Sequence, residues 1–304
     1  MVTSPLLNRH GAVAGVGVDA DVPGHYGDPL REQRTLFTSG ALVDRSHRGV
    51  VKVTGSDRLS WLHSLTSAHL ESLPADEVRE ALILSPHGHV EHHLVLWDDG
   101  ETTWLTTEPG RATALVDYLA SMRFMLRVDV EDVSASYAVL TRVVGDQAHD
   151  ELVPRGELVA RVDGADLALV GHGAWEARRV ARREPRLGFE TDHRTIPHEV
   201  GWIGVAVHLD KGCYRGQETV ARVHNLGRPP RRLVFGHLDG TSDVLPDAHA
   251  GIELDGKSVG FLGTALHHAD LGPIALAVIK RSVPDDAELT VAGMALMAER
   301  VVDA

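Results

Sequence analysis

The stretch KGCYRGQE, residues 211–218, is the most distinctive part of this sequence. It holds the single cysteine of the chain, Cys213, between Gly212 and Gly216, which permit tight turns and leave the backbone accessible. A lone cysteine is most often a small buried hydrophobe, and by itself it can form neither an internal disulfide nor a cluster site. Positive charge at Lys211 favours the thiolate, which is the reactive form. The polar, glycine-flanked setting therefore indicates a functional thiol.

The remaining residues of this stretch have predicted supporting roles. Tyr214 supplies a flat wall with a polar tip. Gln217 and Glu218 begin a predicted helix, and Glu218 lies at the end of the helix dipole that favours negative charge. Arg222 brings a further positive charge close to the cysteine in sequence and also favours its thiolate.

Between residues 50 and 183, strand-like runs alternate with single amphipathic helices. Two rounds of this mixture predict α+β units and not a doubly wound parallel sheet. The predicted strands are 50–53, 81–84, 90–97, 102–106, 126–130, 137–144 and 167–170, and the predicted helices are 58–67, 111–122 and 174–183.

The pattern changes toward the C-terminus, where strand-like segments are separated by Gly, Asp and Pro. This predicts a small all-β module resembling a barrel, with the Pro229-Pro230 pair stiffening the link before it. The first thirty residues have no period, so we expect a loosely packed arm. The predicted domains are therefore 1–35, 36–228 and 229–304, with barrel strands at 233–238, 258–267, 274–280 and 295–302.

Composition excludes several classes of function. The net charge of −13 over 304 residues argues against broad binding of nucleic acid, whose affinity comes largely from Lys and Arg on phosphates. No stretch of eighteen apolar residues occurs, and no basic leader with an apolar run opens the sequence. We expect a cytoplasmic protein with neither a nucleic-acid nor a membrane partner.

The run HGHVEHH, residues 87–93, suggests a metal site at first sight. On a strand, His89, Glu91 and His93 would share one face, while His92 would point the other way. The His-Glu-x-x-His spacing of zinc enzymes does not occur in this run. We therefore interpret it as an exposed strand with a turn and predict no metal in the protein.

Glu184 lies among arginines at the end of a predicted helix, in RREPRLG, residues 182–188. Its carboxylate can form an exposed ion pair, which contributes little to stability. It can instead face a cavity and accept two hydrogen bonds from a flat heterocycle with adjacent N–H and NH2 groups. The residues themselves leave both alternatives open.

Together with Val220-Ala221-Arg222, the stretch at 211–218 resembles the signature of the YgfZ-type folate-binding proteins. These are relatives of the glycine-cleavage T-protein, the aminomethyltransferase. The resemblance covers about residues 36 to 300. Its other parts are VDRSHRG (43–49), VTGSD (53–57), LSPHG (84–88), IPHE (196–199), GFLG (260–263) and ALA (275–277).

This resemblance implies an α+β fold with two interleaved ferredoxin-like units around a folate cavity, plus a C-terminal β-barrel. It implies tetrahydrofolate as the bound cofactor and a role in assembling or repairing iron–sulfur clusters. The implied partners are iron–sulfur assembly proteins or client enzymes. The implied catalytic set is Cys213, Lys211, Tyr214, Gln217 and Glu218, and the implied cofactor-binding set is Glu184, which would contact the pterin, with Arg222 and Glu199.

One departure from the T-protein pattern narrows the function. T-proteins carry a pair of aspartates on the strand after the central turn, and those places hold His92 and His93 here. An imidazole cannot reproduce the electrostatic role of a carboxylate toward a folate amine, so we do not expect glycine-cleavage aminomethyl transfer. Whether this is an enzyme stays open between an iron–sulfur support protein, another folate-dependent one-carbon transferase, and a binding scaffold in which Cys213 only packs. Cys213 itself is a nucleophile, a redox thiol or a transient cluster ligand.

Overall fold

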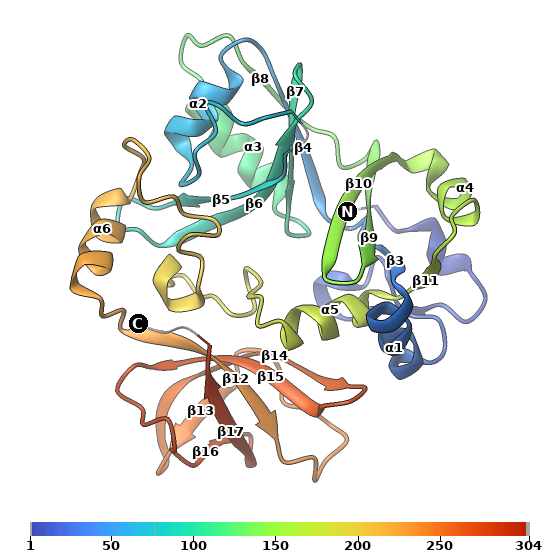
Figure 1. Cartoon of the computed structure of the whole chain (residues 1–304), viewed down its shortest axis with the longest axis vertical. Helices are drawn as coiled ribbons and strands as arrows, with labels where there is room; N and C mark the ends of the chain where they lie inside the picture. The colour runs from blue at the N-terminus through green and yellow to red at the C-terminus, as the bar shows by residue number, and fades with distance from the viewer. Residues whose placement is uncertain (1, 76, 302–304) are drawn as a thin grey trace. The chain divides into compact units, whose positions relative to one another are not determined.

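The structure is a computed structural model that describes residues 2–75 and 77–301 (Figure 1). The chain divides into two compact units, and it passes from one to the other five times. The predicted domain boundaries after residues 35 and 228 stay a prediction. Unit 1 consists of Met1–Trp61, Ser72–Val78 and Leu94–Arg178, and unit 2 consists of Leu62–Glu71, Arg79–His93 and Arg179–Ala304.

A five-stranded sheet has β4 (Gly49–Thr54) next to its edge, paired antiparallel with β7 (Thr102–Thr107) and β8 (Asp129–Asp132). Helix α3 (Ala112–Ser121) packs closely on β4, because a Cβ added at Gly49 would lie 2.9 Å from the Cβ of Ala112. The predicted strand at 126–130 is wrong in its first residues, since Leu126 ends a turn by donating to Arg123 O. The strand order is β5 (Arg79–Leu84), β6 (Val90–Asp98), β7 (Thr102–Thr107), β4 (Gly49–Thr54) and β8 (Asp129–Asp132), and helix α2 spans Arg58–Leu65.

A four-stranded sheet in unit 1 is covered on both faces. Leu42 of β3 packs with residues of helix α4 (Leu158–Asp163), while its neighbour Val43 packs with Leu36 of helix α1 (Pro29–Ser39). This alternation is what a strand buried on both faces requires. The strand order is β10 (Gln147–Pro154), β9 (Tyr137–Val144), β3 (Ala41–Asp44) and β11 (Ala168–Val170).

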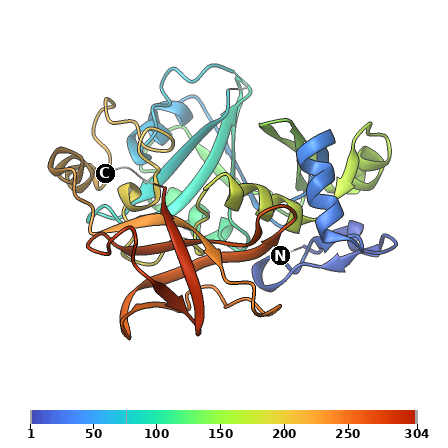
Figure 2. The ribbon, with the colours of Figure 1, turned by 60° about the horizontal axis from the view of Figure 1, so that its bottom comes forward.

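The N-terminal segment is folded, which differs from the loose arm that we expected. Leu6 and Val22 are fully buried, and two short strands, β1 and β2, pair antiparallel. Figure 2 shows this segment running beside α1, which is drawn in blue. The absence of a hydrophobic period led to the wrong prediction, because these residues are buried by elements distant in sequence. The segment contains η1 (Pro5–Asn8), β1 (Val13–Ala14), η2 (Gly17–Asp19) and β2 (Pro23–His25).

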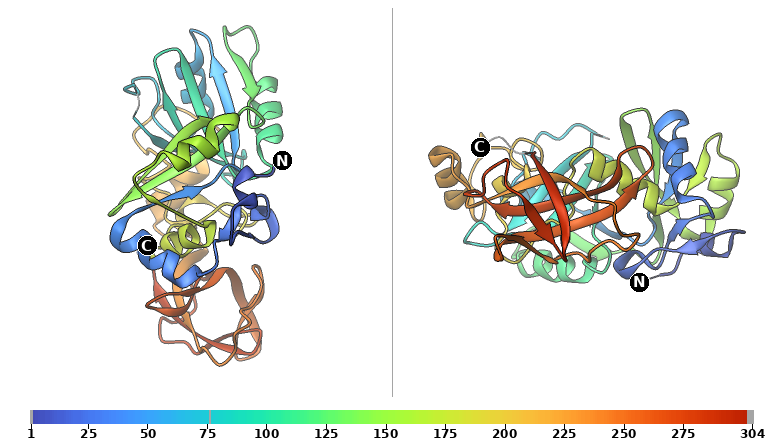
Figure 3. Two further views of the ribbon diagram at one scale, coloured as in Figure 1. Left: turned by 90° about the vertical axis from the view of Figure 1, so that its right-hand side faces the viewer. Right: turned by 90° about the horizontal axis from the view of Figure 1, so that it is seen from below.

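The predicted C-terminal barrel is confirmed as a closed barrel of six strands (Figure 3, left). Along β12, Val234 faces the barrel interior, whereas Leu233 and Phe235 join a second cluster in unit 2 with Leu84 and Trp202. The outer face of the barrel therefore shares a core with β5. The order around the barrel is β12 (Arg231–Leu238), β15 (Gly272–Lys280), β14 (Lys257–His268), β13 (Gly251–Leu254), β16 (Leu289–Val291) and β17 (Met294–Arg300).

The remaining helical elements connect these sheets. The described residues include no helix long and apolar enough to cross a bilayer. The mixed α+β class predicted from the sequence is confirmed. The connecting elements are η3 (Arg155–Glu157), α5 (His172–Ala181), η4 (Pro197–Val200) and α6 (Gln217–Leu226).

Candidate functional site

The turn at residues 211–218 packs backbone against backbone on the turn at 84–88, within unit 2. Gly216 precedes α6 with a φ of 83°, and a Cβ there would lie 2.6 Å from Ser85 O. Gly88 has a φ of 78°, and its added Cβ would lie 2.8 Å from the Cβ of Thr219. Both glycines are thus required by conformation and by space. Two sequence motifs far apart in the chain form one rigid support.

Tyr214 anchors this support in the core. Its side chain belongs to the buried cluster that contains Leu84, Trp202 and Val220, and burial raises its pKa to about 12. Gln217 closes the turn, since its backbone N–H donates to Tyr214 O at 3.2 Å. These contacts show that both residues help to hold the turn, and their predicted catalytic roles stay predictions.

Lys211 is a second anchor, and its ammonium group is buried. Nζ donates to the backbone carbonyl of Thr66 at 2.5 Å and also to that of His63, and it lies 5.0 Å from the centre of the Tyr214 ring. Burial lowers the pKa of Lys211 to about 8. Gln217 Nε2 donates to the Lys211 carbonyl at 3.3 Å. Lys211 therefore ties the turn to α2, and its influence on the Cys213 thiolate stays a prediction.

Cys213 is exposed between these two anchored residues. The general expectation of a buried lone cysteine is therefore wrong for this chain, and so is the alternative in which Cys213 only packs. Arg215, two residues after Cys213, is also held in place, because it forms an ion pair with Glu91 of β6 at 3.0 Å. A thiol that projects from a fixed backbone is accessible to a reaction partner.

Glu218 and Arg222 form an ion pair one turn apart on α6, at 3.0 Å. Both side chains are largely exposed, so this pair stabilises the helix by only about 0.3–0.5 kcal/mol. Either residue can leave its partner at small cost. Their predicted roles in catalysis and cofactor binding stay predictions.

Glu184 lies in the exposed ion pair that was one of its two predicted alternatives. Its carboxylate accepts from Arg182 Nε at 2.7 Å, with 43% of the Glu184 side chain exposed. Its backbone N–H donates to Arg179 O at 2.8 Å, which fixes the position of the main chain. The main chain of Glu184 is therefore fixed, whereas the ion pair between its carboxylate and Arg182 is weak.

Sequence reasoning missed a buried carboxylate nearby, Glu190. It is fully buried, bonds Arg179 at 3.1 Å, and accepts from the backbone N–H of Thr264 at 2.7 Å. A Cβ added at Gly263 would lie 2.5 Å from Glu190 Oε1. The second glycine of the GFLG motif is therefore explained by this ion pair. The only sequence signal was that glycine, because nothing in the pattern separates Glu190 from surface acids.

Glu199, predicted to bind the cofactor, is engaged by the protein itself. Its carboxylate accepts from Arg231 at 2.8 and 2.9 Å and from the backbone N–H of Ile196 at 3.2 Å. Arg231 also bonds Asp192 at 2.6 Å. Burial opposes ionisation of Asp192, but the hydrogen bonds from Arg231 are stronger and hold its pKa well below the usual range. This geometry favours a role for Glu199 in joining η4 to the first barrel strand.

The run at residues 87–93 forms no three-donor cluster among the residues that the structure describes. His93 of β6 interacts with Glu80 at 2.7 Å and stacks on Trp202, with ring centres 4.9 Å apart. Glu91 is occupied by Arg215. In the described part of the chain, the one group of three donors within ligand distance is Asp19, His47 and His172 in unit 1.

Comparison with known proteins agrees with this fold. The whole fold resembles a solved structure of the glycine cleavage system aminomethyltransferase T from Bartonella henselae. The TM-score is 0.82 at 16% identity, covering 97% of this chain and 95% of the other. A family model described as the GCVT N-terminal domain matches residues 4–155, half of the chain. The chain therefore belongs to the GCVT family, as the sequence predicted.

Three particular proteins are similar to this chain in sequence. The tRNA-modifying protein YgfZ of Edwardsiella ictaluri is 28% identical over 295 residues, covering 79% of this chain and 85% of its own. The aminomethyltransferase of Bacillus subtilis is 22% identical over 331 residues, covering 91% and 90%. A chloroplastic protein of Arabidopsis thaliana, provisionally named as a transferase, is 25% identical over 297 residues, covering 83% and 68%.

Proposed function

We propose that this chain is a tetrahydrofolate-binding protein that supports the assembly or repair of iron–sulfur clusters, with Cys213 as its key thiol. One observation carries the proposal: the single cysteine of the chain is exposed on a turn whose backbone is fixed against residues 84–88. A structural cysteine would be buried and inert. Attack on a partner, thiol redox chemistry and transient cluster ligation all require a sulfur that partners can reach.

Folate is assigned to the same protein by its family and by the resemblance of its motifs. The proposed arrangement is two interleaved ferredoxin-like units around a folate cavity. Glu184 would bind the pterin, because its present partner Arg182 is exposed and a pair of that kind contributes less than about 1 kcal/mol. A heterocycle with two adjacent N–H donors can replace Arg182 at little cost.

Two further residues divide between binding and support. Arg222 is proposed to bind an anionic part of the folate, since its exposed pair with Glu218 is easily exchanged for another carboxylate. Glu199 is better explained as a positioning residue, because Arg231 and the Ile196 N–H already occupy its carboxylate.

A second candidate function is a folate-dependent one-carbon transferase. The likeness of the whole fold to an aminomethyltransferase favours it. The imidazoles at the expected aspartate positions disfavour it: His92 and His93 are buried in β6, and His93 is held by Glu80. A carboxylate beside the folate amine is what that transfer needs.

The thiol is tested by complementation, in a deletion strain whose iron–sulfur enzymes lose activity unless a copy of this gene is supplied. The variants Cys213→Ala and Cys213→Ser should fail to restore the activity of iron–sulfur enzymes, while Ser282→Ala, an exposed residue of unit 2, should restore it fully. Because relatives are named as tRNA-modifying proteins, modified nucleosides in tRNA are a second readout. Full activity with Cys213→Ala would remove Cys213 from the mechanism.

Folate binding is tested separately, by calorimetry with tetrahydrofolate and the purified chain. Cys213→Ala should bind as the wild type does, whereas Glu184→Gln should bind at least about 10-fold more weakly. Glu299→Gln is the matched control, because Glu299 forms a similarly exposed pair with Arg183 at 3.1 Å. Turnover of methylenetetrahydrofolate by the purified chain would favour the transferase instead.

A further inference from the structure

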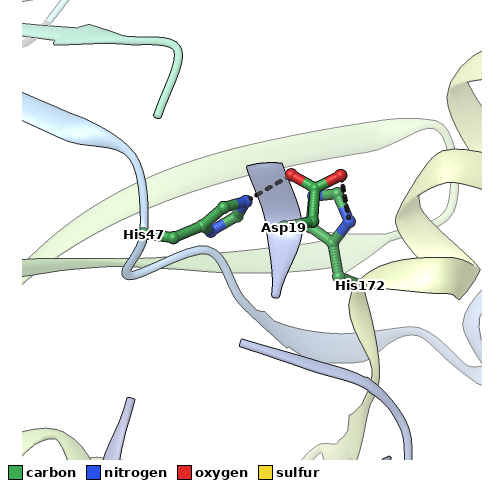
Figure 4. Close-up of side chains that lie close together, drawn as sticks. All are labelled: Asp19, His47 and His172. Carbon is green, nitrogen blue, oxygen red and sulfur yellow. Dashed lines mark hydrogen bonds and ion pairs between the residues drawn. The ribbon is translucent and has the colours of Figure 1, made fainter. Parts of the chain in front are cut away.

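Three ligand-type side chains of unit 1 converge at one buried point (Figure 4). Asp19 comes from η2, His47 from the turn between β3 and β4, and His172 from the first residue of α5. They are 8%, 4% and 4% exposed, and one ligand atom of each lies within 4.8 Å of the others. Their distant positions in the sequence explain why no motif predicted this cluster.

The distances between the donor atoms fit a shared ion. His47 Nε2 lies 2.8 Å from Asp19 Oδ1, and His172 Nδ1 lies 3.8 Å from Asp19 Oδ2. Neighbouring ligands around a tetrahedral zinc ion are about 3.3 Å apart, given zinc–nitrogen bonds of about 2.0–2.1 Å. The two distances lie on either side of that value. The two distances involve different oxygens of Asp19, so an ion shared by all three side chains would require them to shift toward one point.

The two imidazoles approach the carboxylate of Asp19 at different distances. The separation of His47 and Asp19 is a normal hydrogen bond, but 3.8 Å between His172 and the carboxylate is too long for one. The rings of His47 and His172 are perpendicular, with centres 4.9 Å apart, so both direct a nitrogen at the same carboxylate. Two imidazoles that converge on one carboxylate are a common donor set for divalent transition metals.

The outward nitrogen of His172 faces a second carboxylate. Its Nε2 lies 4.0 Å from Oε1 of Glu176, which is one turn later on α5 and mostly buried. A carboxylate behind a coordinating histidine orients the ring and makes its other nitrogen a better ligand. At 4.0 Å the two groups are beyond hydrogen-bond distance, so Glu176 would support His172 in this way only after a small side-chain shift.

The backbone that carries these donors is held in place. A Cβ added at Gly171, just before His172, would lie 2.2 Å from Gly24 O, and the Gly171 N–H donates to Glu32 Oε2 at 2.7 Å. The turn that holds His47 is fixed by Asp44, which accepts from the Ser46 N–H at 2.9 Å. Donors on such a fixed frame need little reorganisation to bind.

We propose that Asp19, His47 and His172 form a binding site for one divalent transition-metal ion of the zinc class, with water as a further ligand. Mg²⁺ and Ca²⁺ are disfavoured, because they prefer oxygen donors and two of these three donors are nitrogens. The ion would fasten the N-terminal segment and α5 to the turn after β3. This site is distinct from Cys213, and the proposal does not depend on the folate assignment.

The test uses the full chain, stripped with a chelator and titrated separately with Zn²⁺ and Co²⁺. We expect one tight equivalent, visible d–d absorption of bound Co²⁺, and a metal-dependent rise in Tm. Asp19→Asn and His172→Gln should each weaken that equivalent by at least about 100-fold. His69→Gln is the matched control, because His63 and His69 have the same ring geometry, 4.9 Å and 89°, outside this cluster.

Uptake of less than one tight equivalent by the wild type would overturn the proposal, and so would an equal loss in His69→Gln. If the ligand variants do not fold, crystals of the wild type grown with Zn²⁺ decide the question by anomalous scattering at the zinc edge. A peak among Asp19, His47 and His172 supports the site. Peaks only at other histidines, such as those at residues 87–93, would refute it.

Discussion

The substitution Gly216→Ala tests whether the turn at 211–218 is held as tightly as its geometry indicates. Gly216 has a φ of 83°, a left-handed conformation that costs a residue with a side chain about 1–2 kcal/mol. The new methyl group would also lie 2.6 Å from Ser85 O and 3.0 Å from Gly88 Cα. These are backbone atoms that cannot rotate away, and such overpacking costs about 1–3 kcal/mol. The free energy of unfolding should therefore fall by about 2–5 kcal/mol.

The other end of the same helix supplies the control. Gly227 follows α6 with a φ of 62°, and a Cβ added there would meet nothing within 4 Å. Gly227→Ala should therefore lose only the conformational part, about 1–2 kcal/mol. The difference between the two variants isolates the contact between the two turns.

Urea unfolding followed by circular dichroism measures both losses, provided that the slope m is the same in the wild type and the two variants. A loss at Gly216 no larger than the loss at Gly227 would refute the close packing of the two motifs. A larger loss accompanied by failure of the strain assay would connect this packing to the function of Cys213.

Three further predictions concern buried charges. Glu190→Gln should lower the free energy of unfolding by about 3–5 kcal/mol, because the buried guanidinium of Arg179 loses the negative charge of Glu190. Glu299→Gln, in an exposed pair, should change the free energy of unfolding by less than about 1 kcal/mol, and equal effects of the two variants in thermal unfolding would contradict this. Lys211 has a pKa of about 8 in the folded protein and 10.5 in the unfolded chain, so the unfolded chain binds more protons between these pH values. The free energy of unfolding should therefore rise with pH from about 8 to 10.5. Urea unfolding of Lys211→Met should lack this rise. Burial lowers the pKa of His198 to about 4, so stability should fall as pH drops from 6.5 toward 4, and a fall of the same size in His198→Gln would argue against this.

The sequence was most informative about elements that are largely buried. The strand at 137–144 was predicted with its observed bounds, because apolar residues fill it and turn residues flank it. Its partner β10 was missed, since half of its residues, in QAHDELVP, are polar and seven of the eight are at least partly exposed. An edge strand of that kind is held by backbone pairing, which leaves no hydrophobic pattern to detect.

Some features of the candidate site could be predicted from the sequence, and others could not. The glycines around Cys213 correctly predicted a tight turn, because their conformational freedom is a local property, whereas the exposure of the thiol comes from the structure. The carbonyl partners of Lys211 at His63 and Thr66 could not be predicted, since they are backbone atoms and carry no residue preference. The cluster of Asp19, His47 and His172 depends on tertiary structure alone.

The interleaving of the two units has a consequence for how the protein is made. The segments 62–71 and 79–93 leave the ribosome early, but the rest of unit 2 begins only at Arg179 and ends with the last residue. At about 5–20 residues per second, these segments wait roughly 10–40 s for the chain that completes their core. During that time the apolar strand at 79–84 has no barrel to cover it. Co-translational folding of this protein should therefore depend on chaperones that shield a nascent strand, and neither unit should be obtainable by simple truncation of the gene.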